Sequence, residues 1–359
     1  MTTVYRVACI GASRMASWFD DIQRERATKD GGRSREWVPG AIASVCQAID
    51  RAELVAVCDL KPELVEQLRD RWHIPAGYTD WHEMVERERP DIVTIVTSWG
   101  RTHAALAAGV AETGLVRGIY CEKPIATSMS EADRIVAACR EHGVAYTCAH
   151  VFRWNARYRQ ALAWIQEGAI GEVRSVVCNG MSSLLHSGTH QTDIAAGLAG
   201  DADVEWATGW ADVAPELPQD QWPKNDPAGG GLVQLANGVQ LLFDGRAPGP
   251  RVFQVNGTQG KVYLSNDLRQ VQLWRRSEEP GVVDLVPGPL ESPAQEKSYA
   301  VTQMEELLQV LDHGGRPSCD EVRAARALEM ALGFHLSHRQ GGARVRFPLA
   351  DRAFAVDTI

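Results

Sequence analysis

Apolar runs alternate with amphipathic helical patterns through the first 150 residues of the chain. The apolar runs cover Val4–Ile10, Glu53–Cys58, Asp91–Thr97, Gly118–Cys121 and Val144–Cys148. The segments between them place apolar residues at helical spacing over Pro62–Trp72, Asp80–Glu88, Thr102–Thr113 and Ser128–His142. Continuous apolar strands separated by helices indicate a parallel sheet covered on both faces, so residues 1–150 are predicted to form one α/β domain.

The pattern changes after about residue 150, where short strands replace the regular alternation. Strands are predicted at Gly171–Asn179, Val204–Asp212, Leu232–Leu235, Val239–Phe243, Val252–Val255, Lys261–Leu264, Val271–Trp274 and Arg344–Phe347. Turn signals such as Asn237-Gly238 favour antiparallel neighbours. Helices are predicted at Ala156–Gln166, Thr189–Leu198, Val301–His313 and Asp320–Gln340. We therefore expect residues 151–359 to form an α+β domain with a large, mostly antiparallel open sheet.

Length, charge and cysteine usage narrow the class of protein. A chain of 359 residues exceeds one ordinary core, in agreement with two domains. The formal net charge of −9 argues against nucleic acid as the main partner. The 8 cysteines show no C-x-x-C spacing, and the N-terminus lacks a signal-peptide pattern, so we expect a reducing, cytoplasmic setting. No apolar run is long enough to predict a membrane span.

The turn after the first predicted strand is similar to a dinucleotide-binding fingerprint. Gly11 takes the place of the first glycine in G-x-G-x-x-G/A, and Ala16 takes the last position. Ser13 replaces the second glycine, so the motif alone is a weak signal, but the preceding strand supports a Rossmann domain. Gly11, Ser13, Arg14 and Met15 are the candidate contacts to the cofactor in this turn.

Asp59 ends the second predicted strand, where an acidic side chain binds the adenosine ribose and repels a 2′-phosphate. This position favours NAD over NADP, although Lys61 could tolerate a phosphate. Asp59 could instead be a helix N-terminal acid before Pro62. It lies further from the fingerprint than usual because of an insertion at Arg24–Gly40, which we expect to be a loop or lid edge.

Glu122-Lys123-Pro124 follows a buried strand, and ligands of open α/β sheets bind at the carboxyl ends of strands. Proline biases Lys123 toward an extended backbone, and its amine could handle a proton on a substrate hydroxyl. A solvated lysine at a strand end is the alternative. Thr97, Ser98 and Trp99 end the preceding strand, on the side expected to face the nicotinamide. His103 either touches cofactor or substrate, or faces solvent at the start of a helix.

A second cluster of polar residues runs from His186 through Thr189 and His190 to Asp193. His186 and His190 could share a helix face, and Asp193 could orient the ring of His190, which makes His190 a candidate proton carrier. Two histidines and a carboxylate also suit zinc or iron, and His186 with Ser187 could simply cap a helix. We predict no metal, because no H-E-x-x-H motif is present.

Aromatic and basic side chains near residue 150 are candidates for substrate binding. Trp99 and Trp154 could cover the apolar face of a sugar, although core packing explains most of the 11 tryptophans. Arg153 and Arg157 could bind an anionic substituent of the substrate, or could be solvated helix charges.

These residues together resemble the glucose–fructose oxidoreductase/inositol dehydrogenase/MocA family (Gfo/Idh/MocA). The resemblance runs almost end to end, and Glu122-Lys123-Pro124 combined with Thr189-His190-Gln191-Thr192-Asp193 is its specific part. It implies a Rossmann domain followed by an open-sheet domain that often pairs between subunits, hence a homodimer or homotetramer. It also implies that Lys123 and His190 act on the substrate hydroxyl. Many members carry an aspartate where this chain has His186, which puts that residue's role in doubt.

The sequence thus predicts an NAD-dependent oxidoreductase that acts on a sugar, glycoside or cyclitol. His190 is the expected base and Lys123 the group that polarises the oxygen, although the roles could be exchanged. A glycoside hydrolase that oxidises its substrate transiently and recycles NAD is the first alternative, with His186 supplying acid–base chemistry. A non-catalytic sugar or nucleotide sensor is the second. None of these readings requires nucleic acid or a membrane.

Overall fold

A computed structural model describes residues 3–357 except 99, 182, 215, 218–225, 248, 278 and 280–283. The chain divides into two compact units. The first contains residues 1–151 together with 295–322, and the second contains residues 152–294 and 323–358. The sequence predicts one boundary near residue 150. In the structure, residues 295–322 return to the first unit, and the second unit resumes at residue 323.

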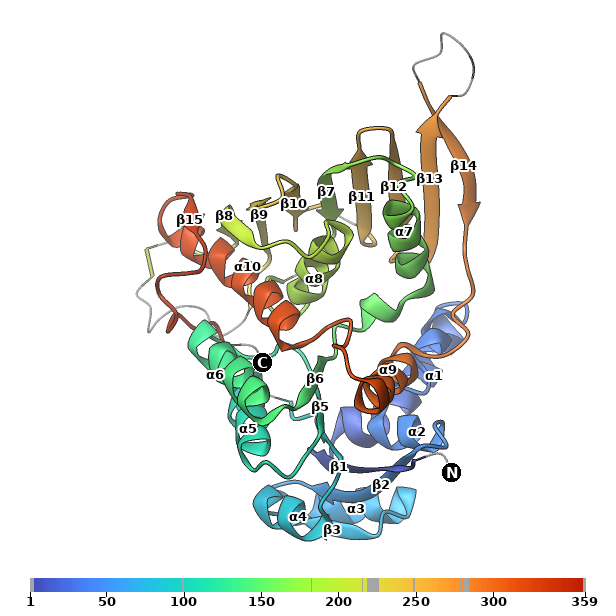
Figure 1. Cartoon of the computed structure of the whole chain (residues 1–359), viewed down its shortest axis with the longest axis vertical. Coiled ribbons are helices and arrows are strands. Elements are labelled where there is room, and N and C mark those ends of the chain that lie inside the picture. Colours follow the sequence, from blue (N-terminus) through green and yellow to red (C-terminus); the bar gives the residue numbers. More distant parts are fainter. Residues whose placement is uncertain are drawn as a thin grey trace. The chain divides into compact units, whose positions relative to one another are not determined.

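The first unit is built on a parallel sheet, whose strands β1 to β6 are labelled in Figure 1. Its strands are β1 (Tyr5–Ile10), β2 (Ala52–Cys58), β3 (Ala76–Tyr78), β4 (Ile92–Ile95), β5 (Gly118–Cys121) and β6 (Ala145–Cys148). The described strands have the order β3-β2-β1-β4-β5-β6, and every neighbouring pair is parallel. The strand order reverses between β1 and β4, which is where ligands bind in such sheets. The predicted parallel Rossmann sheet is confirmed.

Helices cover this sheet because each places apolar side chains on one face. They are α1 (Phe19–Lys29), α2 (Ile42–Gln47), α3 (Pro62–Trp72), α4 (Trp81–Glu88), α5 (Gly100–Glu112), α6 (Met129–His142) and the returning α9 (Tyr299–His313). The capping box predicted at Ser128 and Glu131 is present at the start of α6. Met304 and Leu307 of α9 are fully buried in the same core as Val7 of β1, so the return of the chain completes the hydrophobic core of this unit.

The insertion at residues 24–40 is mostly helical, so the prediction of a loop is wrong, while its role as a lid edge stays a prediction. It contains the end of α1 and a 3-10 helix, η2 (Arg33–Trp37). Asp20 explains this order: its buried carboxylate accepts hydrogen bonds from the backbone N–H groups of Gly40 and Ala41, at 2.8 and 2.9 Å. The Trp37 ring also packs edge-on against Tyr299 of α9, with centroids 5.0 Å apart. The insertion is therefore closed at its base and attached to the core.

The second unit contains an open sheet of nine described strands, labelled β7 to β15 in Figure 1. The strands are β7 (Val173–Asn179), β8 (Val204–Ala211), β9 (Gly229–Leu235), β10 (Gln240–Asp244), β11 (Val252–Gly257), β12 (Gly260–Ser265), β13 (Gln270–Arg276), β14 (Leu285–Glu291) and β15 (Val345–Arg346). Their order is β14-β13-β12-β11-β7-β10-β9-β8-β15. Among the described strands of this sheet, only β7 and β10 pair in parallel, so the predicted mostly antiparallel sheet is confirmed.

β14 is a strand that the sequence pattern does not predict. Its residues include Pro287, Gly288 and Pro289, which are typical of a loop. The strand lies at the edge of the sheet, where a proline does not interrupt hydrogen bonds on both sides. The position in the sheet, which the local sequence does not encode, therefore decides the structure of this segment.

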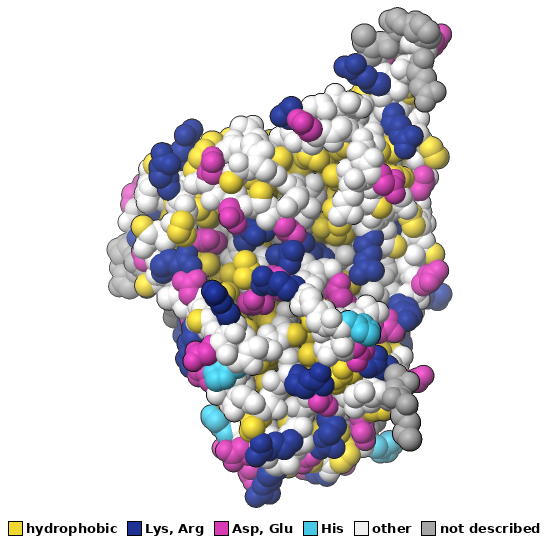
Figure 2. Space-filling view, in the orientation of Figure 1, with side chains coloured by type: hydrophobic (Ala, Val, Ile, Leu, Met, Phe, Trp, Pro, Cys, Tyr) yellow, Lys and Arg dark blue, Asp and Glu magenta, His cyan; other side chains and the backbone are white. Residues whose placement is uncertain are grey.

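Helices α7 (Ala156–Gln166), α8 (Gly188–Leu198) and α10 (Glu321–Arg339) lie on the viewer's side of this sheet in Figure 1. Thr192 of α8 donates a hydrogen bond to the carbonyl of Ala327 in α10, at 2.9 Å, which fixes the two helices to each other. In the described residues, no helix is sufficiently long and apolar for a membrane span. Figure 2 shows basic and acidic side chains mixed over the visible face.

The buried imidazole of His335 in α10 predicts a loss of stability in acid. Burial lowers its pKa from 6.5 to about 3, with a smaller contribution from His338. Below pH 6.5 the unfolded chain binds a proton that the folded chain excludes, so the free energy of unfolding falls by up to about 1.4 kcal/mol per pH unit. Urea unfolding at pH 7 and pH 5 should show a smaller loss for His335→Leu than for the wild type. Equal losses would contradict the prediction.

Candidate active site

A cavity of about 580 Å³ opens at the carboxyl ends of β1, β2 and β4 in the first unit. Five of the predicted cofactor residues line it: Gly11, Ser13, Asp59, Thr97 and Ser98. Sequence reasoning missed several further lining residues, which follow strand ends or lie on the first two turns of helices: Leu60, Leu64, Trp81, Arg101, Thr102 and Leu106. Their apolar surface suits a flat aromatic base, while the strand ends supply polar groups.

The backbone at Gly11 leaves no room for a side chain. Its φ of +99° is in the left-handed region, and its N–H donates to the carbonyl of Cys58 at 2.8 Å. An added Cβ would lie 3.0 Å from backbone atoms of Val96 and Thr97. The turn therefore crosses closely over the end of β4, as the first glycine of a dinucleotide fingerprint does. The cavity and this cradle fit a dinucleotide.

Ser13, Arg14 and Met15 lie where the turn enters the first helical segment, a π-helical turn, η1 (Arg14–Trp18). The carbonyl of Ser13 accepts hydrogen bonds from the N–H groups of Ala16 and Ser17, both at 3.1 Å. Met15 packs against the hydrophobic core, and the guanidinium of Arg14 is exposed, 6.0 Å from the ring centroid of Phe19. Neither side chain is among those that line the cavity.

The carboxylate of Asp59 connects the glycine turn with the start of α3. One oxygen accepts from the N–H of Ala12 at 2.8 Å, and the other accepts from the N–H of Lys61 at 3.0 Å. The N-cap of α3 is Lys61, so the acid lies two residues before the cap. Two hydrogen bonds leave acceptor capacity on a carboxylate, which the diol of a ribose can use.

Lys123 and Glu122 are half-buried directly after β5. The carboxylate of Glu122 accepts from the N–H of Lys123 at 3.3 Å. His103, on the first turn of α5, is buried with 2% of its surface exposed, so the alternative that it faces solvent is wrong. Its ring lies between two backbone carbonyls, those of Pro124 at 2.8 Å and Thr97 at 3.1 Å. Trp99 lies outside the described residues.

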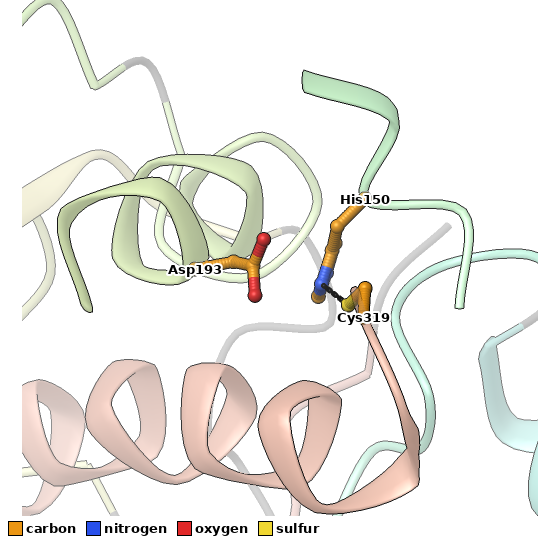
Figure 3. A group of neighbouring side chains, drawn as sticks. All are labelled: His150, Asp193 and Cys319. Carbon is orange, nitrogen blue, oxygen red and sulfur yellow. Dashed lines mark hydrogen bonds between the residues drawn. The ribbon is translucent and has the colours of Figure 1, made fainter. Parts of the chain in front are cut away.

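A thiol and an imidazole meet in the core of the first unit, at a place that the sequence does not indicate. Nδ1 of His150 lies 3.4 Å from Sγ of Cys319, and both side chains are buried (Figure 3). The third side chain drawn in that view, Asp193, belongs to α8 of the second unit. Among the described residues, neither His186 nor His190 belongs to a cluster of His, Cys, Asp or Glu side chains that could hold a metal ion. The alternative of a zinc or iron site on those two histidines therefore has no support.

α8 begins at Gly188, so His186 lies in the preceding turn and does not share its helical face with His190. Ser187 is the N-cap residue but makes no capping hydrogen bond with its side chain, so the predicted capping role is wrong. Asp226, which the sequence analysis did not identify, fixes this turn: its carboxylate accepts from the N–H groups of Leu184 and Leu185, among others. No local motif marks Asp226, which lies about 40 residues further along the chain.

Asp193 is paired with Arg153 in the interior of the second unit. The guanidinium of Arg153 donates to both carboxylate oxygens of Asp193, at 2.8 and 2.9 Å. It also donates to Asp201, at 2.8 Å. Burial alone would raise the pKa of Asp201, but its contacts with Arg153 and Arg323 lower it. Arg153 is only 5% exposed. It is therefore not a solvated helix charge, and its guanidinium is not freely available to bind an anion.

The remaining predicted substrate residues differ in accessibility. Trp154 is 1% exposed and Arg157 is 5% exposed, so Trp154 packs in the core and Arg157 is not a solvated charge. Thr189 is buried and donates to the carbonyl of Leu185 at 2.7 Å. His190 is half-buried, and its ring packs edge-on against Phe152, with centroids 5.2 Å apart. Of these residues, His190 keeps part of its surface exposed, and its contact with Phe152 orients its ring.

A family model described as "Oxidoreductase family, NAD-binding Rossmann fold" matches residues 35–150. The D-apiose dehydrogenase of Paraburkholderia graminis is 26% identical over 323 residues, which cover 82% of this chain and 83% of that protein. The inositol 2-dehydrogenase of Salmonella typhimurium is 27% identical over 130 residues, 36% of this chain and 38% of that protein.

Solved structures of similar fold cover nearly the whole chain. A levoglucosan dehydrogenase in complex with NADH and levoglucosan has a TM-score of 0.74 at 18% identity, covering 97% of this chain and 100% of that one. An oxidoreductase from Agrobacterium radiobacter, in complex with NAD⁺, L-tartaric acid and magnesium, has a TM-score of 0.73 at 19% identity, covering 96% and 98%. At this identity they establish that the two-part architecture is shared.

The buried Arg153–Asp193 pair predicts a large cost for removing one partner. Asp193→Leu leaves a buried guanidinium with only part of its compensation, so the free energy of unfolding should fall by about 3 kcal/mol. Replacing both partners, Arg153→Met with Asp193→Leu, should recover most of that loss. Glu112→Gln is the matched control, because it breaks the exposed pair with Arg134 and should cost at most about 1 kcal/mol. Equal costs for the buried and exposed pairs in urea unfolding would contradict the prediction.

Proposed function

The chain belongs to the Gfo/Idh/MocA family of NAD-binding oxidoreductases, and we propose that it transfers a hydride between NAD and a secondary hydroxyl carbon of a sugar, glycoside or cyclitol. The observation that carries the proposal is the cavity at the strand ends of the first unit, lined by the Gly11 turn and Asp59, in the same sheet whose strand β5 leads to Lys123. The proposal adds His190, which is half-buried on α8 of the second unit. The named relatives that act on apiose and inositol support a polyhydroxylated substrate.

The cofactor half of the proposal rests on residues of the first unit. The cavity presents the backbone turn at Gly11 for the pyrophosphate and the carboxylate of Asp59 for the ribose diol. Thr97 and Ser98 supply polar groups at the end of β4. Bound NAD would supply the hydride acceptor, and the protein supplies orientation and proton transfer.

The substrate half assigns a proton carrier and a polarising group. We assign His190 as the base that takes the hydroxyl proton, because an imidazole changes its charge near neutral pH. Lys123 then stabilises the developing alkoxide through its ammonium group. The contact of His190 with Phe152 holds its ring, while the pairing of Asp193 with Arg153 anchors the next turn of the same helix. Neither group needs a metal for these roles.

The direct test is a panel of pentoses, hexoses, cyclitols and nitrophenyl glycosides incubated with the protein and NAD, with absorbance at 340 nm as readout. We expect NADH formation with at least one polyol, and loss of about 10²- to 10⁴-fold in kcat for Lys123→Ala and for His190→Ala. Lys297→Ala and His82→Ala are matched controls, since both side chains are exposed and paired on the surface of the first unit. Their kcat should stay close to that of the wild type.

Two outcomes would contradict this proposal. Release of nitrophenol without net NADH would favour the hydrolytic alternative. Tight NAD binding with no turnover of any compound, and no effect of Lys123→Ala on that binding, would favour a sensor.

The position of Asp59 predicts cofactor preference. Asp59→Asn removes the charge that repels a 2′-phosphate, so kcat/KM with NADP relative to NAD should rise by about 10-fold, which corresponds to about 1.4 kcal/mol. Lys61→Ala should change the same ratio in the opposite direction, because it removes a cation that lines the cavity two residues from Asp59. A ratio that does not respond to either substitution would show that the ribose binds elsewhere.

A further inference from the structure

His103 is a buried histidine whose ring joins the two loops that flank the proposed hydride-transfer site. One loop follows β4 and contains Thr97, and the other follows β5 and contains Lys123 and Pro124. Nδ1 of the ring lies 2.8 Å from the carbonyl oxygen of Pro124, and Nε2 lies 3.1 Å from the carbonyl oxygen of Thr97. The side chain of His103 is not among those that line the cofactor cavity, so direct contact with a cofactor in that cavity does not explain its position.

Both neighbours of the ring are carbonyl oxygens, which only accept hydrogen bonds. A neutral imidazole has a single N–H and can donate to one of them, whereas the imidazolium can donate to both. The contact with Pro124 is the shorter of the two, and it is the one that a proton on Nδ1 would serve. Because the ring is 2% exposed, water cannot readily replace this donor, and its loss would leave a buried carbonyl unsatisfied.

Besides the contact with His103, the loop after β4 makes a second hydrogen bond, which does not involve the loop after β5. The hydroxyl groups of Thr97 and Thr102 lie 2.7 Å apart, so Thr97 is held to α5 even without the ring. Pro124, which directly follows Lys123, has the ring of His103 as the partner of its carbonyl oxygen. The two loops therefore depend on His103 to different degrees.

We propose that His103 is a positioning residue for Lys123, acting through a hydrogen bond from Nδ1–H to the Pro124 carbonyl. This inference rests on the proposed function, in which Lys123 polarises the substrate oxygen. The hydrogen bond fixes the backbone directly after the lysine and so sets where its amine points. A displacement of about 1 Å in such a group costs on the order of 10²-fold in rate.

Three substitutions separate the two carbonyl contacts. In His103→Asn the amide nitrogen is attached to Cγ, as Nδ1 is, so this variant keeps a donor toward Pro124. In His103→Gln the amide nitrogen corresponds to Nε2 and keeps a donor toward Thr97. His103→Leu fills similar volume with no donor. Thr94→Val is the control, because it removes a buried hydrogen bond to the carbonyl of Ala8 within the sheet and leaves both contacts of the His103 ring in place.

We expect kcat to fall by about 10²-fold in His103→Leu and His103→Gln and to be largely retained in His103→Asn. The dissociation constant for NAD should change much less than kcat in all of them, and Thr94→Val should keep its kcat. Rescue by glutamine in place of asparagine overturns the proposal, as does an equal loss in all three variants or retention of kcat in His103→Leu.

A second readout does not depend on turnover. In protein labelled with ¹⁵N in histidine, two-bond proton–nitrogen correlations identify which ring nitrogen carries a proton, and His103→Asn assigns the signal. We expect a proton on Nδ1 of His103, and a proton on Nε2 alone overturns the proposal. If no compound in the panel yields NADH, the proposed function fails, while this measurement still decides the His103 contact.

Discussion

The close approach of the Gly11 turn to the end of β4 is the constraint on which the cofactor half of the site depends. Neighbouring parallel strands end at the same edge of the sheet, and the strand order reverses there. A side chain at Gly11 would press against the backbone of Val96 and Thr97, so the turn could not lie over the strand. Asp59 holds the same turn from the other side, through the N–H of Ala12. The cavity exists because these backbone segments converge.

The second unit orients α8, the helix that carries the proposed base, by a different means. Its α8 is nearly all buried, and a buried ion pair with Arg153 anchors it one turn beyond His190. Such a pair adds little net stability, but it is costly to break, so it favours one arrangement of the helix over others. Thr192 and Asp226 add hydrogen bonds on either side. The orientation of His190 thus follows from polar contacts in an apolar interior.

The sequence predicted the features that depend on local pattern. Apolar runs and helical periodicity located the parallel sheet, the antiparallel sheet and most helices, because both patterns report which face of an element is buried. The motif at Glu122-Lys123-Pro124 could be placed at a strand end for the same reason. The glycine turn and Asp59 could be assigned because their roles need specific residue types at specific places.

Features that depend on tertiary contacts could not be predicted. Asp20 closes the insertion through backbone groups 20 residues away, and no local signal reveals this. The local sequence suggests that Arg153 is a charged surface residue, because its partners Asp193 and Asp201 lie far along the chain. β14 reads as a loop until it is seen at a sheet edge. His103 illustrates the same point, since the carbonyls that define its role lie on two other segments.

A crystal structure of the protein with NAD and the polyol that it oxidises tests the central claim most directly. We expect one ring carbon at about 3–3.5 Å from C4 of the nicotinamide, with the amine of Lys123 and the ring of His190 both within hydrogen-bond distance of the hydroxyl on that carbon. A complex in which either side chain lies away from the sugar, or in which the nicotinamide faces no carbon of it, would contradict the account.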